Sequence, residues 1–274
     1  MFQYQGKTAL ITGASAGIGA EFARALAARG TNVILVARSQ DRLQTLADEV
    51  ARDHGVRAEA IAADLARPGA ARELRVAVEA RGLTGDLLVN NAGFGTHGPF
   101  ETLAPEREGA EVALNVAAVV DLTHLFLPAM LAKGDGAVVN VASTAAFQPV
   151  PYMAVYGATK AFVLSFSEAL WAEYRGRGVR VLALCPGRTA TEFFDVIGTD
   201  SAAARGAKRT SAQVVETGLH ALERGRGYAV DGRANYLTAQ VSRVLPRNRV
   251  ARIMARVARP RRAAPRQDTV AQHR

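Results

Sequence analysis

Short apolar segments rich in Val, Ile, Leu and Ala alternate with longer segments of helical character from residue 7 onward. The short segments have the length of strands that are buried on both faces, and the longer ones have the length of helices. We expect strands at residues 7–12, 32–37, 57–62, 86–90, 136–142, 179–185 and 227–230. Strands that alternate with helices in this way predict a single α/β domain, with one doubly wound parallel sheet and helices on both faces.

The net charge of +9 is concentrated at the C-terminal end of the chain. From residue 243 onward there are ten arginines and one aspartate, so this part alone carries a charge of +9. The rest of the chain is close to neutral, and the basic balance therefore gives no support to a nucleic-acid-binding fold. With 49% hydrophobic residues, the chain can form one large core. We expect a domain at residues 1–245 and a basic tail at 246–274.

Apolar residues recur at helical spacing among the arginines of the tail, at Val250, Ile253, Met254 and Val257. This pattern predicts an amphipathic helix that frays at Pro260. We favour the interpretation that the apolar stripe packs on the protein's own domain or on another subunit. The alternative is that the helix lies on an anionic membrane or on an acidic partner.

Several classes of site and location are disfavoured. Residues 1–7 hold no apolar stretch of signal-peptide length, and no later segment is an uninterrupted apolar run of roughly 18 residues, so we expect a cytoplasmic protein. Cys185 is the single cysteine, and the five histidines lack ligand-like spacing, so we expect neither a disulfide nor a metal site. Because Cys185 lies in an apolar segment, we interpret it as a buried structural thiol.

Glycine-rich sequence follows the first expected strand. Gly13, Gly17 and Gly19 lie between that strand and a helical segment. Glycines there permit a tight turn and close approach of the backbone to a pyrophosphate, while the helix N-terminus faces the phosphates. The spacing differs from the G-x-G-x-x-G of the larger dinucleotide-binding dehydrogenases, and a turn without a ligand is the alternative.

The residues at the end of the second expected strand bear on the choice of nucleotide. A site for NAD usually has an acidic residue there to bind the ribose hydroxyls, but this chain has Ala37 and Arg38. A guanidinium suits a 2′-phosphate, so we predict NADP(H), with a solvated surface arginine as the alternative. Asp64, after the third strand, is either a partner for the adenine amino group or a helix cap.

Three asparagines stand out in the middle of the chain. Asn90 and Asn91 end the fourth expected strand, where exposed backbone can lie against a cofactor and where asparagine also suits a turn. Asn115 lies in an otherwise apolar helical segment. A buried amide there needs hydrogen-bond partners, and it either holds a water or accompanies a local distortion of the helix.

Ser143 ends the fifth expected strand, and Tyr156 follows at the start of the sequence Y-G-A-T-K. On a helix, Tyr156 and Lys160 share a face, which brings the ammonium beside the phenol. Free tyrosine titrates near pH ~10, and a neighbouring cation lowers its pKa toward a range useful for acid/base chemistry. Ser143 is placed to donate a hydrogen bond to a substrate oxygen on which charge develops.

Taken in order, the glycine-rich turn, N-N-A-G, Asn115, Ser143, Y-G-A-T-K and Pro186-Gly187 resemble the short-chain dehydrogenase/reductase family over roughly residues 5–245. The resemblance implies a Rossmann-type sheet, usually seven-stranded, and a catalytic tetrad. In that scheme Tyr156 is the acid or base, and Lys160 lowers its pKa and binds the nicotinamide ribose. Ser143 orients the carbonyl, and Asn115 supports a water-linked proton relay. The expected cofactor-binding positions are Gly13, Ser15, Gly17, Ile18, Gly19, Arg38, Asp64, Leu65, Asn91, Ala92, Gly93, Tyr156, Lys160, Pro186, Gly187 and Thr189.

The positions expected to border a substrate are mostly apolar, and they are Phe94, Ala145, Phe147, Val150, Pro151, Tyr152, Phe193, Phe194 and Val196. Apolar walls favour a hydrophobic ketone or aldehyde, although each of these residues also suits the core or a mobile lid. The small, polar segment 198–210 is expected to close over substrate.

We therefore predict an NADP(H)-dependent oxidoreductase that transfers hydride between the nicotinamide and a ketone or alcohol on a hydrophobic substrate. A 3-oxoacyl-thioester reductase is the alternative within this class. A non-catalytic NADP-binding protein and a basic-tailed interaction protein are weaker alternatives. The resemblance also implies a homodimer or homotetramer assembled through helices at 101–133 and 153–176.

Overall fold

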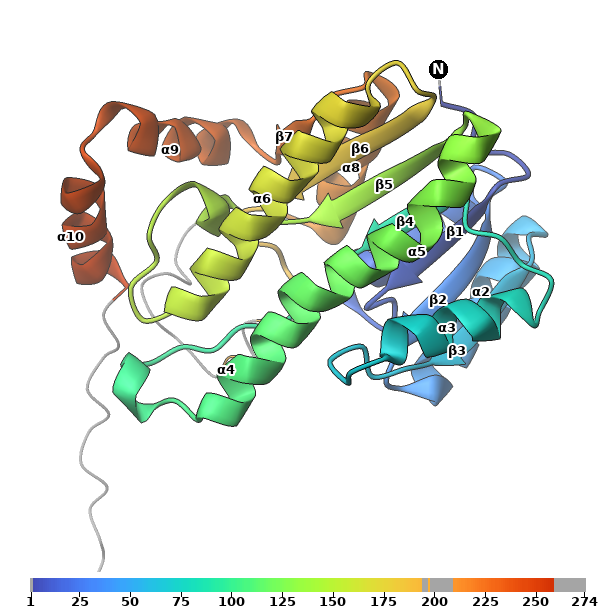
Figure 1. Cartoon of the computed structure of the whole chain (residues 1–274), viewed down its shortest axis with the longest axis horizontal. Coiled ribbons are helices and arrows are strands. Elements are labelled where there is room, and N and C mark those ends of the chain that lie inside the picture. The colour runs from blue at the N-terminus through green and yellow to red at the C-terminus, as the bar shows by residue number, and fades with distance from the viewer. Residues whose placement is uncertain (1, 194–196, 198–208, 259–274) are drawn as a thin grey trace, which may run out of the picture.

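A computed structural model of the chain describes residues 2–193, 197 and 209–258 (Figure 1). The strands are β1 (Thr8–Thr12), β2 (Asn32–Ala37), β3 (Ala58–Ala62), β4 (Leu87–Asn90), β5 (Gly136–Val141), β6 (Val179–Cys185) and β7 (Tyr228–Val230). The α-helices are α1 (Gly17–Ala27), α2 (Gln40–His54), α3 (Ala70–Glu79), α4 (Pro105–Val112), α5 (Ala118–Lys133), α6 (Ala154–Tyr174), α8 (Ser211–Glu223), α9 (Arg233–Val244) and α10 (Arg247–Val257). Two short turns of 3₁₀-helix, η1 (Phe100–Thr102) and η3 (Thr144–Phe147), and one π-helical turn, η2 (Ala113–Ala117), complete the elements.

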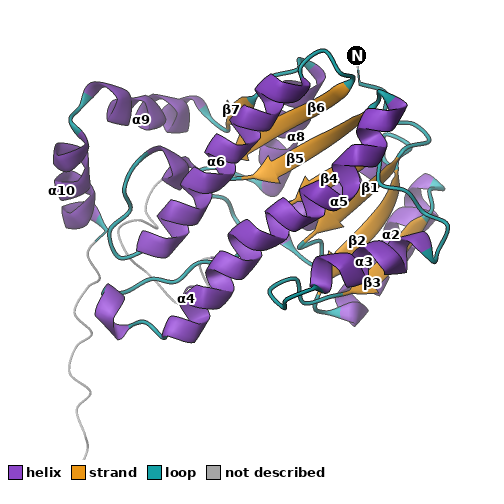
Figure 2. Ribbon diagram, viewed as in Figure 1, coloured by secondary structure: helices purple, strands orange, loops and turns teal. Residues whose placement is uncertain are grey.

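The seven strands form one sheet in the order β3-β2-β1-β4-β5-β6-β7, and every neighbouring pair is parallel (Figure 2). The predicted doubly wound Rossmann-type sheet is confirmed, and each strand begins and ends within one residue of its expected bounds. The strand order reverses between β1 and β4. In such sheets, ligands bind beyond the carboxyl ends of the strands at that point.

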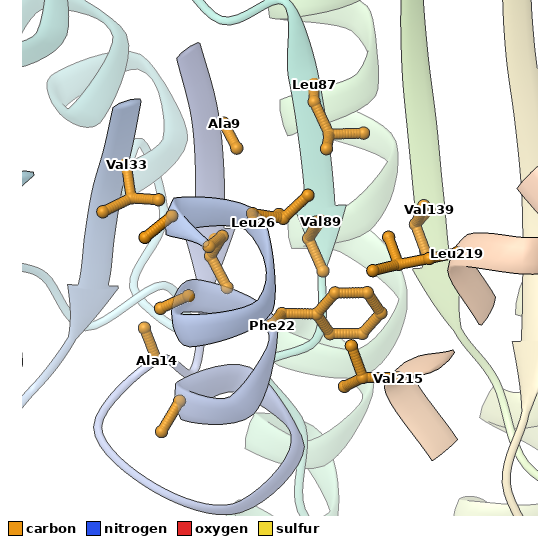
Figure 3. Packing of buried hydrophobic residues seen from close by; sticks show 14 of the residues in the cluster. Ala9, Ala14, Phe22, Leu26, Val33, Leu87, Val89, Val139, Val215 and Leu219 are labelled. Atoms are coloured by element: carbon orange, nitrogen blue, oxygen red, sulfur yellow. The ribbon is translucent and has the colours of Figure 1, made fainter. Parts of the chain in front are cut away.

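Both faces of the sheet are covered because successive side chains of each strand point to opposite sides. Ala9 and Ile11 of β1 belong to one core cluster with residues of α1, α2 and α8, whereas Leu10 belongs to a second cluster with residues of α3 and α5. Phe22 of α1 is fully buried in the first cluster, where Figure 3 shows its ring beside Val215 and close to the strand that carries Val89. Apolar burial on two faces explains why the strands read as continuous hydrophobic runs.

A buried polar network joins β4, β5 and α6. Asn90 Nδ2 donates to Asn140 Oδ1 at 2.9 Å, and Asn140 Nδ2 donates to Ser167 Oγ at 2.9 Å. All three side chains are buried. Buried polar groups need such partners in place of water, so these hydrogen bonds hold β4 and β5 in position relative to α6.

Helices α4 and α5 run on through η2 as one continuous helix. By length and composition alone, the segment 105–133 is the one helix in the described part of the chain that could cross a membrane. In this fold, several of its side chains pack in the core. Leu122, Phe126 and Met130 are buried in the second core cluster, against the sheet.

The C-terminal helices α9 and α10 form an arm that follows β7, and α9 packs on η3 and β7 (Figure 1). The tail predicted to begin at residue 246 contains α10, in which Val250 is buried while Ile253 and Val257 are half-exposed. Pro260, where the helix was expected to fray, lies outside the described residues.

Candidate active site

The turn between β1 and α1 is held in shape by a side chain from the end of β4. Asn91 Nδ2 donates to the carbonyl oxygens of Thr12 at 2.9 Å and Gly13 at 3.2 Å. Gly13 has a φ of 65°, and a Cβ atom at Gly19 would lie 2.2 Å from the Gly13 carbonyl oxygen. Glycine is therefore required at both positions by the turn itself. The peptide N–H groups of Asn91 and Ala92 also donate to Thr12 Oγ1, at 3.0 and 2.9 Å.

The N-terminus of α1 has the character of an anion site. Its N-cap, Ala16, offers no side-chain hydrogen bond, and the first turn contains no acidic residue. The N–H groups of the first turn and the positive end of the helix dipole thus point toward the carboxyl edge of the sheet, a geometry that suits a dinucleotide pyrophosphate. Ser15 and Ile18 flank this end, and a surface cavity of about 310 Å³, lined in part by Ser15 and Arg42, adjoins it.

The structure places the two residues predicted to bind the adenosine part of the nucleotide at neighbouring strand ends. Arg38 follows β2 and is exposed, and no ion pair with it is found among the described residues. Asp64 follows β3, and its Oδ1 accepts a hydrogen bond from the Ala66 N–H at 3.1 Å. Asp64 therefore shapes a local turn and does not cap α3, which begins at Ala70 with Gly69 as N-cap. Leu65 is buried beside it.

Four side chains meet at the carboxyl edge of the sheet. They are Asn115 of η2, Ser143, which follows β5, and Tyr156 and Lys160 of α6. Tyr156 and Lys160 lie on one buried face of α6, with the Lys160 Nζ 5.8 Å from the centre of the Tyr156 ring. Lys160 Nζ donates to the Val141 carbonyl oxygen at 2.8 Å. Ser143 follows β5, and its Oγ accepts from the Ala145 N–H at 3.1 Å, which leaves the hydroxyl hydrogen available for another acceptor.

Asn115 lies at the centre of the π-helical turn η2. Its Oδ1 accepts from the Phe94 N–H at 3.2 Å, and its Nδ2 donates to the Phe94 carbonyl oxygen at 2.9 Å and to Thr159 Oγ1 at 3.1 Å. The local helix distortion that the sequence suggested is therefore present, and the amide is fully used in joining the segment after β4 to α6. Gly93 packs between this amide and Lys160.

The pKa values of the central pair are set mainly by burial. Burial raises the pKa of Tyr156 to about 12, partly offset by a hydrogen bond with Ser143 and reinforced by Glu111. Burial also lowers the pKa of Lys160 to about 8. Burial dominates the pKa of Tyr156, and the lowering expected from Lys160 stays a prediction. The Lys160 ammonium is bonded to the Val141 carbonyl oxygen, and burial of the phenol is the largest influence on the pKa of Tyr156.

Glu111 is a buried carboxyl that the sequence analysis missed. It lies one turn before Asn115, is fully buried, and accepts a hydrogen bond from Thr96 Oγ1 at 2.9 Å through Oε2. No hydrogen-bond partner of its Oε1 is found in the described structure. Burial raises the pKa of Glu111 to about 7, and the nearby Glu108 carboxylate adds to the rise. The available signal was a carboxylate four residues before Asn115, on the same helix face.

Comparison with known proteins identifies the family. Residues 7–202 match the family model described as short chain dehydrogenase. The chain belongs to this family. A curated relative, the very-long-chain 3-oxoacyl-CoA reductase of Bos taurus, is 34% identical over 192 residues, which cover 69% of this chain and 61% of the relative. The chain spans about three fifths of the length of the first curated relatives that it matches.

Two solved structures resemble almost the whole chain. A short-chain dehydrogenase from Sphingobium yanoikuyae in complex with NADPH has a TM-score of 0.78 and 32% identity, and the match covers 95% of this chain and 99% of that one. A short-chain dehydrogenase/reductase from Burkholderia phymatum in complex with NAD has a TM-score of 0.79 and 26% identity, and covers 90% of this chain and 98% of that one. Similar structures thus contain either nicotinamide cofactor.

In this short-chain dehydrogenase, the segment after β6 lies beside Ser143. The Pro186 carbonyl oxygen accepts from the Thr144 N–H at 2.9 Å, and Thr189, a buried residue, donates to the Gly187 carbonyl oxygen at 3.2 Å. The predicted cofactor-binding segments after β1, β4 and β6 therefore all reach the carboxyl edge of the sheet.

The predicted substrate residues lie in different surroundings. Phe193 lies against Tyr156, with ring centres 5.4 Å apart, and Phe94 lies on the segment bonded to Asn115. Phe147, by contrast, packs with Tyr228 against the third core cluster. Ala145, Val150, Pro151 and Tyr152 lie in the described segment between Ser143 and α6, where Tyr152 has a φ of 66°. Phe194, Val196 and residues 198–208 of the expected lid lie outside the described residues.

Proposed function

We propose that this protein is an NADP(H)-dependent oxidoreductase that transfers hydride between the nicotinamide and a ketone or alcohol group on a hydrophobic substrate. The observation that carries the proposal is the pairing of Tyr156 and Lys160 on one buried face of α6, near Ser143. Acid/base chemistry at a carbonyl requires a proton donor and a second hydrogen-bond donor at the same oxygen.

The residues fit a bound nicotinamide dinucleotide. The N-terminus of α1 would hold the pyrophosphate, and the segments after β4 and β6 would line the rest of the cofactor. The cofactor supplies or accepts the hydride.

Tyr156 acts on the substrate oxygen. In the direction of reduction, its hydroxyl donates a proton to that oxygen while Ser143 donates a hydrogen bond to it. A pKa above neutrality keeps Tyr156 protonated and ready to donate. Lys160 stabilises the phenolate that remains, and Asn115 holds the segment after β4 against α6.

Replacing the tyrosine hydroxyl tests this role. Tyr156→Phe keeps the ring against Phe193 and removes the proton donor, so kcat/KM for NADPH-dependent ketone reduction is expected to fall by roughly 10²–10⁴-fold. Nucleotide affinity should stay within a factor of two or so of the native value. Tyr236→Phe, on the exposed face of α9, is the matched control and should leave kcat/KM unchanged. Full activity in Tyr156→Phe would refute the assignment.

The preference for NADP(H) rests on Arg38, an exposed guanidinium where NAD enzymes usually have an acidic residue. Fluorescence titrations with NADPH and NADH separately, on the native protein and on Arg38→Ala, measure this preference. We expect NADPH to bind more tightly and the variant to lose the difference. Arg52→Ala, an exposed arginine paired with Asp53 on α2, serves as the control. Equal affinities in the native protein would remove the NADP(H) assignment while leaving hydride transfer intact.

A 3-oxoacyl-thioester reductase is the second candidate, and the similarity to the bovine 3-oxoacyl-CoA reductase favours it. Measuring kcat/KM for simple ketones, hydroxysteroid ketones and 3-oxoacyl thioesters of increasing chain length separates the candidates. A rise with apolar chain length supports a hydrophobic substrate, and a preference for small charged ketones would contradict it.

A further inference from the structure

The outward face of α9 is an apolar surface that the rest of the described protein leaves uncovered. Leu237 and Val244 are 68% and 82% exposed, and Tyr236 and Val241 are also exposed. These residues share one side of the helix, and Ala239, which is buried, lies on the other side. Exposed leucine and valine in such a row indicate an interaction surface.

Exposed arginines lie on the same two helices as this apolar face. Arg233 begins α9, and Arg247, Arg249, Arg252 and Arg256 of α10 are all exposed. Ile253 and Val257 of α10 add two half-exposed apolar side chains beside them. The described structure pairs none of these five arginines with a carboxylate, and residues 232–257 contain no aspartate or glutamate. Residues 259–274 carry five further arginines and one aspartate.

The charge decides between possible occupants of this face. A second copy docked symmetrically would bring arginine-bearing surfaces against one another, which opposes association. A nucleic acid would pair with the arginines but would have no use for an exposed row of Leu237, Val241 and Val244. A membrane with anionic headgroups satisfies both features, because the apolar side chains enter the interface while the arginines meet the headgroups. Tyr236 also belongs to a residue type that is enriched at that depth.

We propose that the outward face of α9 and α10 is a docking surface for membranes that contain anionic phospholipid. The arm is built against the candidate active site. Helix α9 packs on η3, the turn that follows Ser143, and His97 Nε2 lies 3.4 Å from the carbonyl oxygen of Ala258 at the end of α10. Docking would therefore bring the segments that border the site close to the lipid interface. This proposal stands on the surface alone and does not depend on which carbonyl compound is reduced.

Sedimentation of the full-length protein with vesicles tests the proposal directly. We expect recovery with vesicles of equal parts phosphatidylcholine and phosphatidylglycerol, little recovery with phosphatidylcholine alone, and release at high salt. Arg249→Gln with Arg256→Gln is expected to weaken partition by about 30-fold, since each arginine near an anionic surface contributes about fivefold. Leu237→Ser with Val244→Ser is expected to weaken it by at least tenfold, because two exposed apolar side chains no longer enter the interface.

A matched control lies on α3, where Val76 is 64% exposed and Arg72 is also exposed. Arg72→Gln with Val76→Ser should leave recovery unchanged. Circular dichroism and NADPH titration confirm that each variant is folded. Equal recovery of the native protein with both vesicle types would overturn the proposal, as would equal losses in the α3 control. Light scattering without lipid gives a third test. If the native protein is an oligomer and Leu237→Ser with Val244→Ser is a smaller species, a second copy covers the face and the membrane proposal is wrong.

Discussion

Glu111 gives the protein a pH dependence that a single substitution should remove. The carboxyl is fully buried, has one hydrogen bond from Thr96, and has its pKa raised from 4.5 to about 7. The charged and titratable groups around it are Glu108 on its own helix and Tyr156 and Lys160 on α6. Glu111→Gln keeps the shape and the acceptor for Thr96 but can no longer ionise.

The magnitude of this pH dependence follows from the linkage between protonation of Glu111 and folding. Because folding raises the pKa of Glu111, the unfolded chain releases this proton at lower pH than the folded protein does. The contribution of Glu111 to stability is therefore complete below pH 4.5 and is lost as the pH rises through about 7. A difference of one pKa unit corresponds to about 1.4 kcal/mol, so between pH ~5 and ~8.5 the native protein should lose about 2–3 kcal/mol through this group.

Urea unfolding followed by the fluorescence of Trp171, across that pH range, measures the effect. The free energy of unfolding of Glu111→Gln relative to the native protein should rise by about 2–3 kcal/mol between the acidic and alkaline ends. Glu106→Gln, an exposed position on the same helix, is the control and should show a difference that does not change with pH. If the Glu111→Gln difference is also constant with pH, the carboxyl does not titrate as its burial requires.

Three further predictions concern the turn, the core and the buried network. Gly19→Ala places a Cβ 2.2 Å from the Gly13 carbonyl oxygen, so it should lower the free energy of unfolding in urea by about 1–3 kcal/mol and abolish NADPH binding. Normal NADPH binding would show that the turn can adjust. Phe22→Ala removes a fully buried ring and should cost about 3–5 kcal/mol, and a loss under about 1 kcal/mol would mean that the core collapses into the space. Asn140→Ala removes one of the two acceptors of the Asn90 amide and the donor to Ser167, and should cost about 1–3 kcal/mol and lower kcat without changing the NADPH dissociation constant. An unchanged kcat would show that this network does not position the site.

The strands could be predicted from the sequence because a parallel sheet buries both faces, so each strand appears as an unbroken apolar run. The short loops at the strand ends then placed Gly13, Asn91, Ser143 and Tyr156 at one edge. What could not be predicted are properties that depend on distance. Lys160 is four residues from Tyr156 in the sequence, yet its ammonium is bonded to the carbonyl oxygen of Val141, and burial is the largest influence on the pKa of the tyrosine.

The C-terminal arm is a second case in which the sequence pattern predicts an element but not its contacts. The spacing of Val250 and Ile253 predicted an amphipathic helix, but helical spacing does not say which apolar residues find a partner. In the folded protein Val250 is buried and Ile253 is half-exposed. The exposed apolar face of α9 could not be predicted, because Leu237 and Val244 are ordinary helix residues until their surroundings are known.

The hydrogen bonds of Asn91 bear on how this chain can be recombined with its relatives. The turn after β1 takes its shape from a side chain 78 positions further along, so the two segments form one unit although three helices and three strands lie between them in sequence. A chimera that joins its first eighty residues to the remainder of a relative should bind nucleotide only when the relative supplies an amide at the position of Asn91. With a relative that lacks this amide, successful crossover points should therefore lie after residue 93 rather than between the first and fourth strands.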